Sequence, residues 1–183
     1  MNTTKSLFIT DPLVELNPKK DTTILWMQEV AKQSGQVFQC EISDLIYCDG
    51  LTHAKASEIP NVASQPQAAN APGELLSLNA FDYVFMRKDP PVDENYMNAL
   101  HLLSQAKNEG ANVMNDPDAL KKFNEKVFAL RFSKWMPDTR VICKQEDLLS
   151  FKEKYQTVIL KPLDGMGGES IYKLNEIGSE EEA

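Results

Sequence analysis

The sequence predicts an α/β fold, because apolar strand patterns alternate with helical patterns along most of its 183 residues. The alternation in the first part predicts an open, mostly parallel sheet with helices on both faces. Towards the end of the chain the pattern becomes strand, helix, strand, glycine-rich turn and strand, which predicts a second and smaller unit. With 42% hydrophobic residues, the chain can bury the core of one domain, or of one domain and part of another.

The first elements follow from short apolar runs and the residues that stop them. Asp11-Pro12 ends a first apolar run, and Gly35 ends a run whose apolar residues recur at helical spacing. Asp49-Gly50 is a turn signal after two further apolar runs. In chain order, the elements predicted from these signals are a strand at 7–9, a helix at 22–33 and a strand at 37–42, and the apolar run at 46–48 precedes the turn.

A polar stretch and a pair of prolines punctuate the middle of the chain. Residues 58–73 contain three prolines among several Ala, Asn and Gln, and we expect a surface loop there, with or without fixed structure. Pro90 and Pro91 end the next apolar run, since proline cannot donate to a strand ladder. The elements predicted here are a strand at 81–86, a helix at 96–107 and a strand at 111–114.

A long helix is predicted after these strands. Asp116 suits the N-cap position and Pro117 the first helical position. The helical spacing continues to about Trp135, and Met136-Pro137 then breaks it. The elements predicted beyond the break are a strand at 141–143, a helix at 146–155 and strands at 158–160 and 171–174.

Charge and cysteine content exclude several classes of protein. The net charge of −8 disfavours a nucleic-acid or anionic-membrane surface, so any phosphate site must be local. The apolar run near the N-terminus is too short for a signal peptide or a membrane helix. Cys40, Cys48 and Cys143 show no C-x-x-C spacing, and we expect small hydrophobic side chains rather than reactive thiols, in a cytoplasmic protein.

The stretch "VILKPLDGMGGESIYKL" at 158–174 combines a lysine with a glycine-rich turn. Lys161 closes an apolar run, and Gly165, Gly167 and Gly168 surround Met166 in the turn that follows. Backbone N–H groups in such a turn can approach a phosphate closely, and the nearby ammonium adds a point charge. A flexible hairpin with a solvated lysine explains this stretch, taken alone, equally well.

Charged residues also follow two of the predicted strands. Asp11 follows the first strand, and Arg87 follows the strand at 81–86. Ligands of open parallel sheets bind outside the carboxyl ends of the strands, so Arg87 and Lys88 could bind a carboxylate substrate there. The alternative is a solvated surface on which Arg87 pairs with Asp89.

Three motifs, taken together, resemble a known family. "FMRKDPP", "NDPDALKKFNEKVFALRF" and "ILKPLDGMGGESIY" occur in the order and at the separations seen in bacterial glutathione synthetases of the ATP-grasp superfamily. "LFITDPL" and "NPKKDTT" fit as well, so the resemblance extends over nearly all of the chain up to Leu174. It implies an N-terminal pre-ATP-grasp α/β domain at 1–117 and the smaller, partial ATP-grasp subdomain at 118–183.

The resemblance also implies roles for individual residues. Lys126 of "NEK" and Lys161 of "LKP" would contact the phosphates of ATP, and Gly165 to Gly168 would fold over them. Arg87 and Asp11 would line the peptide-substrate side of the cleft. No catalytic residue is assigned within these 183 residues.

The implied reaction joins γ-glutamylcysteine to glycine. ATP phosphorylates the cysteinyl carboxylate to an acyl phosphate, the glycine amine attacks it, and ADP and phosphate leave, while Mg²⁺ neutralises charge on the phosphoryl group. No cysteine or serine nucleophile is required. The implied partners are these small molecules and further copies of the chain in a homotetramer, with no nucleic acid and no membrane.

The sequence departs from the family at its end. The magnesium-binding residues of such enzymes are absent before "NEIGSEEEA", so we expect them beyond residue 183, and we expect the 183 residues alone to be inactive. The acidic end itself should be poorly ordered. Two alternatives stay open: another ATP-grasp carboxylate-amine ligase, and a truncated paralogue that serves as a binding or assembly module.

Overall fold

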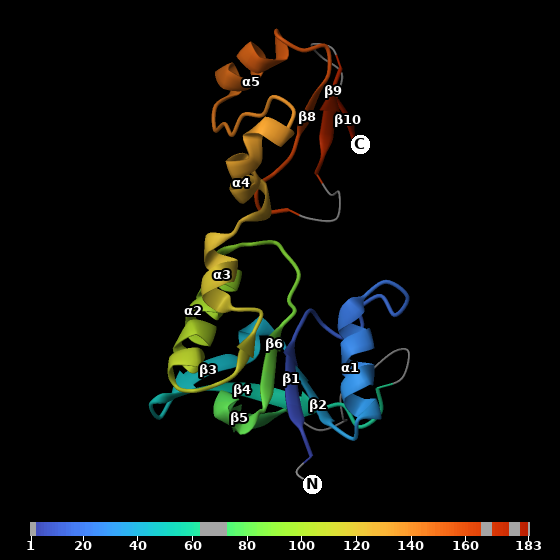
Figure 1. Ribbon diagram of the computed structural model, residues 1–183, viewed down its shortest axis with the longest axis vertical. Helices are drawn as coiled ribbons and strands as arrows, with labels where there is room; N and C mark the ends of the chain where they lie inside the picture. Colours follow the sequence, from blue (N-terminus) through green and yellow to red (C-terminus); the bar gives the residue numbers. More distant parts are fainter. Residues whose placement is uncertain (1–2, 63–72, 166–169, 176–179, 183) are drawn as a thin grey trace. The chain divides into compact units, whose positions relative to one another are not determined.

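The computed structural model describes residues 3–62, 73–165, 170–175 and 180–182, which group into two units (Figure 1). The first unit contains Met1–Asp89 and Asp93–Lys122, and the second contains Pro90–Val92 and Phe123–Ala183.

The sheet of the first unit is parallel at its centre and antiparallel at one side. Its strands are β1 (Lys5–Ile9), β2 (Gln36–Cys40), β3 (Leu45–Cys48), β4 (Leu51–Glu58), β5 (Glu74–Ser77), β6 (Tyr83–Met86) and β7 (Val113–Met114). They follow the order β3-β4-β2-β1-β6-β7, with β5 paired to β4. The β2-β1-β6-β7 part is parallel, as the sequence predicts, whereas β4 and β5 form an unpredicted antiparallel extension.

Helices cover both faces of this sheet. The helices of the unit are α1 (Thr22–Lys32), α2 (Glu94–Asn108) and α3 (Pro117–Lys122), with short 3₁₀ helices η1 (Ile42–Asp44) and η2 (Leu78–Ala80). Phe8 packs with Met27 of α1 on one face, and Leu7 packs with Leu100 of α2 on the other, because successive residues of β1 point to opposite faces. Figure 1 shows α1 and α2 on opposite sides of β1. The predicted α/β class with a doubly covered sheet is confirmed.

Aspartates start both long helices of the first unit. Asp21 accepts a hydrogen bond from the backbone N–H of Thr23 at 2.7 Å, and Asp93 accepts one from that of Tyr96 at 2.8 Å. Each bond satisfies an N–H that has no partner inside its helix. The sequence predicts both helices to within two residues at either end.

The described residues of the second unit form a short antiparallel sheet and three helical segments. Its elements are α4 (Glu125–Ala129), the 3₁₀ helix η3 (Leu130–Trp135), α5 (Gln145–Lys152), β8 (Val158–Leu160), β9 (Tyr172–Leu174) and β10 (Glu180–Glu182). The strand order is β10-β9-β8, and both pairs are antiparallel.

The prediction of one helix from residue 117 to about Trp135 is wrong. The chain leaves the helical conformation at Asn124, where φ is −57° and ψ is 122°. The Asn124 side chain accepts hydrogen bonds from the backbone N–H groups of Lys126 and Val127 at 3.0 and 3.1 Å. An asparagine that bonds neighbouring N–H groups in this way starts a new helix instead of continuing the previous one.

Three other predictions concern shorter segments. Residues 141–143 form no strand: Val141 is 48% exposed, and Val141 and Ile142 contribute to a cavity wall instead of a ladder. Of the acidic end, for which we expect poor order, residues 180–182 pair with β9, and residues 176–179 and 183 lie outside the described residues. Most of the predicted loop at 58–73, namely residues 63–72, lies outside the described residues.

Candidate functional site

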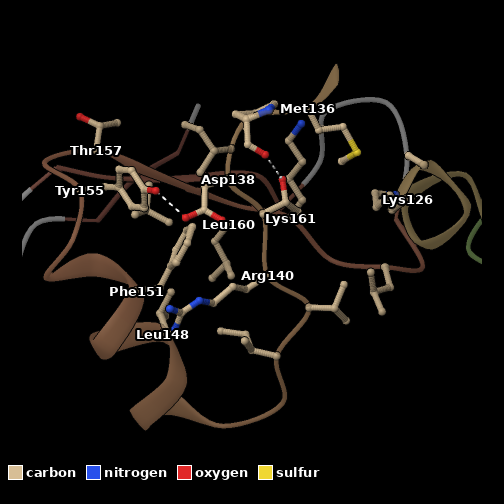
Figure 2. Close-up of a pocket in the computed structure, with 18 of the residues that line it drawn as sticks. Lys126, Met136, Asp138, Arg140, Leu148, Phe151, Tyr155, Thr157, Leu160 and Lys161 are labelled. Atoms are coloured by element: carbon tan, nitrogen blue, oxygen red, sulfur yellow. Dashed lines mark hydrogen bonds between the residues drawn. The ribbon is translucent and has the colours of Figure 1, made fainter. Parts of the chain in front are cut away.

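A cavity of about 770 Å³ lies within the second unit (Figure 2). This volume is in the range of sites that bind cofactors and other small molecules. Its apolar wall includes Met136, Ile142, Leu148, Phe151, Val158 and Leu160, and its charged lining includes Lys126, Lys161, Asp138 and Arg140. The cavity therefore offers an apolar surface beside several charges, which suits a ligand with an aromatic part and an anionic part.

Lys126 is held against the start of the glycine-rich stretch. It is the second residue of α4, and its Nζ donates to the backbone oxygen of Gly165 at 2.6 Å. The same Nζ lies 3.0 Å from a carboxylate oxygen of Glu125, and 22% of the Lys126 side chain is exposed. The structure thus brings together Lys126 and Gly165, two residues that the resemblance assigns to one site.

The backbone just before the glycine-rich stretch is fixed from two directions. The side-chain amide of Asn124 donates to the backbone oxygen of Leu163 at 3.1 Å. The backbone N–H of Val92 donates to the backbone oxygen of Asp164 at 3.2 Å. Residues 163–165 are therefore anchored, whereas the predictions for Met166, Gly167 and Gly168 fall outside the described residues.

Lys161 directly follows β8 and lines the same cavity as Lys126. The residue is exposed, and within the described part of the chain its Nζ has neither an ion pair nor a hydrogen bond. An unpaired ammonium at a cavity edge can bind an incoming anion without first breaking an internal contact.

Polar residues that sequence reasoning missed line another part of the cavity. The hydroxyl of Tyr155 donates to Asp138 (Figure 2), and the ammonium of Lys154, which lies outside the cavity lining, donates to the same carboxylate. These two bonds, of which the one from Lys154 has the larger effect, hold the pKa of the Asp138 carboxyl below its ordinary value. The guanidinium of Arg140 lies 4.9 Å from the centre of the Phe151 ring. These contacts join residues that are distant in sequence, so no local pattern signals them.

Arg87 and Asp11 follow neighbouring parallel strands of the first unit. The backbone N–H of Arg87 donates to the backbone oxygen of Ile9 at 2.8 Å, which places Arg87 at the carboxyl ends of β6 and β1. Asp11 pairs with Lys88 at 2.8 Å and accepts a bond from the backbone N–H of Asp89 at 3.0 Å. Asp11 therefore holds the two residues that follow Arg87.

The Arg87 side chain turns to the start of α1. Its Nε donates to the Thr23 hydroxyl at 3.1 Å, and its Nη2 donates to the Thr22 hydroxyl at 2.9 Å. The alternative interpretation of the sequence was an ion pair with Asp89, but in the described residues Arg87 has no carboxylate oxygen within 4.0 Å. Arg87 is thus a cation held by neutral groups.

Two other kinds of feature are absent from the residues that the structure describes. No helix there is long enough and apolar enough to span a bilayer. No group of three or more His, Cys, Asp or Glu side chains there could hold a metal ion.

Comparison with known proteins gives matches along nearly the whole chain. The family model described as "Prokaryotic glutathione synthetase, N-terminal domain" matches residues 4–121, and that described as "Prokaryotic glutathione synthetase, ATP-grasp domain" matches residues 125–182. The split between the matches lies beside the boundary of the two structural units at Lys122.

Curated proteins named glutathione synthetase are also similar to the chain. The protein of Parasynechococcus marenigrum (strain WH8102) is 41% identical over 170 residues, which cover 93% of this chain and 54% of the relative. The protein of Neisseria meningitidis serogroup A is 38% identical over 177 residues, which cover 94% of this chain and 56% of the relative. That of Vibrio cholerae is 35% identical over 170 residues. The chain spans about half the length of the curated relatives it matches.

Proposed function

The chain belongs to the prokaryotic glutathione synthetase family, and from this premise we propose that it binds ATP and γ-glutamylcysteine for an ATP-dependent carboxylate-amine ligase. The ligase joins γ-glutamylcysteine to glycine and releases ADP and phosphate. One observation carries the proposal: Lys126 and Lys161 line one cavity beside an apolar wall, and Lys126 is bonded to the first glycine of the glycine-rich stretch.

ATP occupies the cavity of the second unit in this proposal. Lys126 and Lys161 bind its phosphates, since two ammonium groups offset charge that water would otherwise stabilise. Gly165 to Gly168 contribute backbone N–H groups, which glycine leaves accessible. The base packs on the apolar wall that includes Leu148 and Leu160.

Arg87 and Asp11 serve the other substrate. Arg87 binds a carboxylate of γ-glutamylcysteine through charge-assisted hydrogen bonds. Asp11 forms the same edge of the site by holding Lys88 and the backbone of Asp89. Both residues leave the carboxyl ends of parallel strands, where ligands of open α/β sheets bind.

The reaction proceeds by phosphoryl transfer and acyl transfer. The cysteinyl carboxylate oxygen attacks the γ-phosphorus of ATP and displaces ADP, and the glycine amine then attacks the acyl carbon and displaces phosphate. The lysines hold the phosphates and neutralise charge on them, so positioning and electrostatics supply the rate. Mg²⁺ supplies charge neutralisation in such reactions, but the described residues do not form a site for it, and no step here depends on residues of this chain binding it.

The 183 residues alone bind nucleotide without forming glutathione, which a test for glycine-dependent ADP release would show. The chain acts in the cytoplasm, in keeping with three cysteines that form no disulfide. It assembles as a homotetramer, which sedimentation equilibrium would detect.

Calorimetric titration of the chain with ATP and with AMP tests the nucleotide site. The two nucleotides share a base and ribose, so their difference in affinity reports the phosphates that the lysines contact. We expect ATP to bind more tightly, and the double variant Lys126→Met with Lys161→Met to lose that preference. Lys173→Met is a matched control, because Lys173 is exposed on β9 and does not line the cavity. Equal affinity for ATP and AMP in the unchanged chain would refute the proposal.

A further inference from the structure

Three side chains in the first turns of α1 contact the guanidinium of Arg87. Thr23 and Thr22 accept its hydrogen bonds at 3.1 and 2.9 Å, and the ring of Trp26 lies 5.2 Å from its central carbon. We call Thr22, Thr23 and Trp26 the α1 cradle. A cation over an indole ring is attracted by the ring's negative face, so all three contacts fix the direction of the guanidinium.

The α1 cradle is anchored in the core of the first unit. Thr23 is buried, and Trp26 packs edge-on against Phe85 with ring centres 5.6 Å apart. Phe85 stacks on the buried ring of Phe8 at 4.9 Å. The backbone N–H of Arg87 is bonded to β1 as well. Since both ends of the arginine meet packed elements, its orientation is set before any ligand binds.

Among the described residues, no carboxylate oxygen lies within 4.0 Å of the Arg87 guanidinium, and the nearby carboxylate of Asp89 interacts with it only at longer range. The carboxylate of Asp21, beside the cradle, caps α1 by accepting from the backbone of Thr23, and that of Asp11 pairs with Lys88. The first turn of α1 contains no acidic residue, so the partial positive charge of the helix start adds to that of the guanidinium. A cation held by hydroxyls and an aromatic ring stays available for an anion.

The unused donors of Arg87 define the shape of that anion. The N–H of Nε and one N–H of Nη2 bond the threonines, so within the described part of the chain both terminal nitrogens keep an N–H without a partner. Two parallel N–H groups at the end of a guanidinium match the two oxygens of a carboxylate.

We propose that the α1 cradle positions Arg87 to bind a substrate carboxylate end-on, with Thr22 and Thr23 as positioning residues and Trp26 as a reporter of occupancy. The inference rests on the proposed function, since the carboxylate is one of those of γ-glutamylcysteine. A carboxylate that binds the guanidinium reduces the net charge over the indole and changes its fluorescence.

Tryptophan fluorescence tests the inference. The chain has two tryptophans, and Trp135→Phe leaves Trp26 as the sole reporter; Trp135 is 78% exposed in the second unit and does not line the cavity. Titration of this chain with γ-glutamylcysteine should give a saturable change in emission. Thr23→Val, which keeps the shape but removes the hydroxyl, should raise the dissociation constant about three- to tenfold. Thr23→Ser, which keeps the hydroxyl, should bind like the parent, and calorimetric affinity for ATP should not change in either variant.

The outcomes separate the cradle from the function on which it rests. If Arg87→Ala leaves γ-glutamylcysteine affinity unchanged, or if the Trp135→Phe chain gives no saturable signal, the substrate site and the cradle are both overturned. If Arg87→Ala weakens binding while Thr22→Val and Thr23→Val do not, the substrate site stands and the cradle is wrong.

A measurement without ligand checks the cradle independently. The N–H of Arg87 Nε should exchange slowly with solvent in nitrogen-15 NMR spectra, because it is bonded to a buried hydroxyl. Thr23→Val should make this exchange fast, and Thr23→Ser should preserve it. Fast exchange in the unchanged chain would contradict the proposal even if the variants fold normally.

Discussion

Replacing Lys126 by Met should lower both the stability and the nucleotide affinity of the second unit, whereas replacing Lys161 by Met should lower affinity alone. Lys126 donates to the backbone oxygen of Gly165 at 2.6 Å, whereas Lys161 has no such contact in the described residues. Methionine keeps the length and apolar stem of lysine, so the change removes mainly the charge and the donor.

The magnitude follows from the bond and its exposure. Hydrogen bonds of charged groups contribute about 1.5–3 kcal/mol to stability. Lys126 keeps 22% of its side chain exposed and also pairs with Glu125, which is 76% exposed, so solvent weakens the contact. We therefore expect a loss of about 1 kcal/mol, and a melting temperature lower by about 2–8 °C, depending on whether the units unfold together.

Affinity should fall further than stability. Loss of one lysine-phosphate contact weakens binding by about 1.5–3 kcal/mol, or about ten- to a hundredfold. Calorimetric titration with a non-hydrolysable ATP analogue measures this loss for Lys126→Met and Lys161→Met, and scanning calorimetry measures the melting temperature. Lys173→Met controls for the change in net charge.

Two results would refute this reasoning. If Lys126→Met lowers the melting temperature but binds the ATP analogue as Lys173→Met does, Lys126 is a structural tether and no phosphate ligand. If Lys161→Met lowers the melting temperature as much as Lys126→Met does, the inference that the Lys161 ammonium makes no stabilising contact is wrong.

Three other changes have distinct expected results. In the full-length enzyme, Arg87→Ala should weaken γ-glutamylcysteine use by roughly 2–3 kcal/mol in steady-state kinetics and leave the KM for ATP unchanged; unaltered peptide kinetics would show that Arg87 does not bind the substrate. Asn124→Ala should destabilise the second unit by about 1–2 kcal/mol in urea denaturation, because the helix cap and the bond to Leu163 are both lost. Asn124→Asp keeps the cap and should lower the stability less. Equal losses of stability in the two variants would contradict the capping role. Burial raises the pKa of the Cys40 thiol far above its ordinary range, so the folded state keeps this proton, and stability should fall as pH rises above the unfolded pKa of about 8.5. Iodoacetamide at pH of about 8 should therefore modify the exposed Cys143 and spare Cys40 in the native chain, as read by mass spectrometry; rapid native modification of Cys40 would contradict its burial.

Local pattern predicts the elements whose buried residues are large. The central strands and both long helices of the first unit bury Leu, Ile, Phe and Met, so their periodicity is visible in the sequence. β4 is different, because the side chains that it buries are those of Thr52, Ala54 and Ala56. Small side chains give a weak apolar signal, and the pairing of β4 with β2 and β5 is non-local. This strand therefore escaped prediction.

The same distinction applies to the candidate site. Lys161 and Gly165 stand in one short stretch and can be noticed together, and a family resemblance pointed to Lys126. The contacts of Arg87 with Thr22 and Thr23 join residues 65 and 64 positions apart, so no spacing rule finds them. The break at Asn124 was visible in principle, since Asn followed by Glu is a common start of a helix.

The second unit is assembled from two separate stretches of the gene. Pro90–Val92 belongs to it although the residues on either side belong to the first unit, and Val92 bonds the backbone oxygen of Asp164. A chimera that replaces only the residues after Lys122 by those of another family member would keep this chain's own Pro90–Val92. That segment would then pack against the other protein's residue at position 164. Exchange at that point therefore does not transfer the second unit whole, and a graft of the second unit should carry both stretches together.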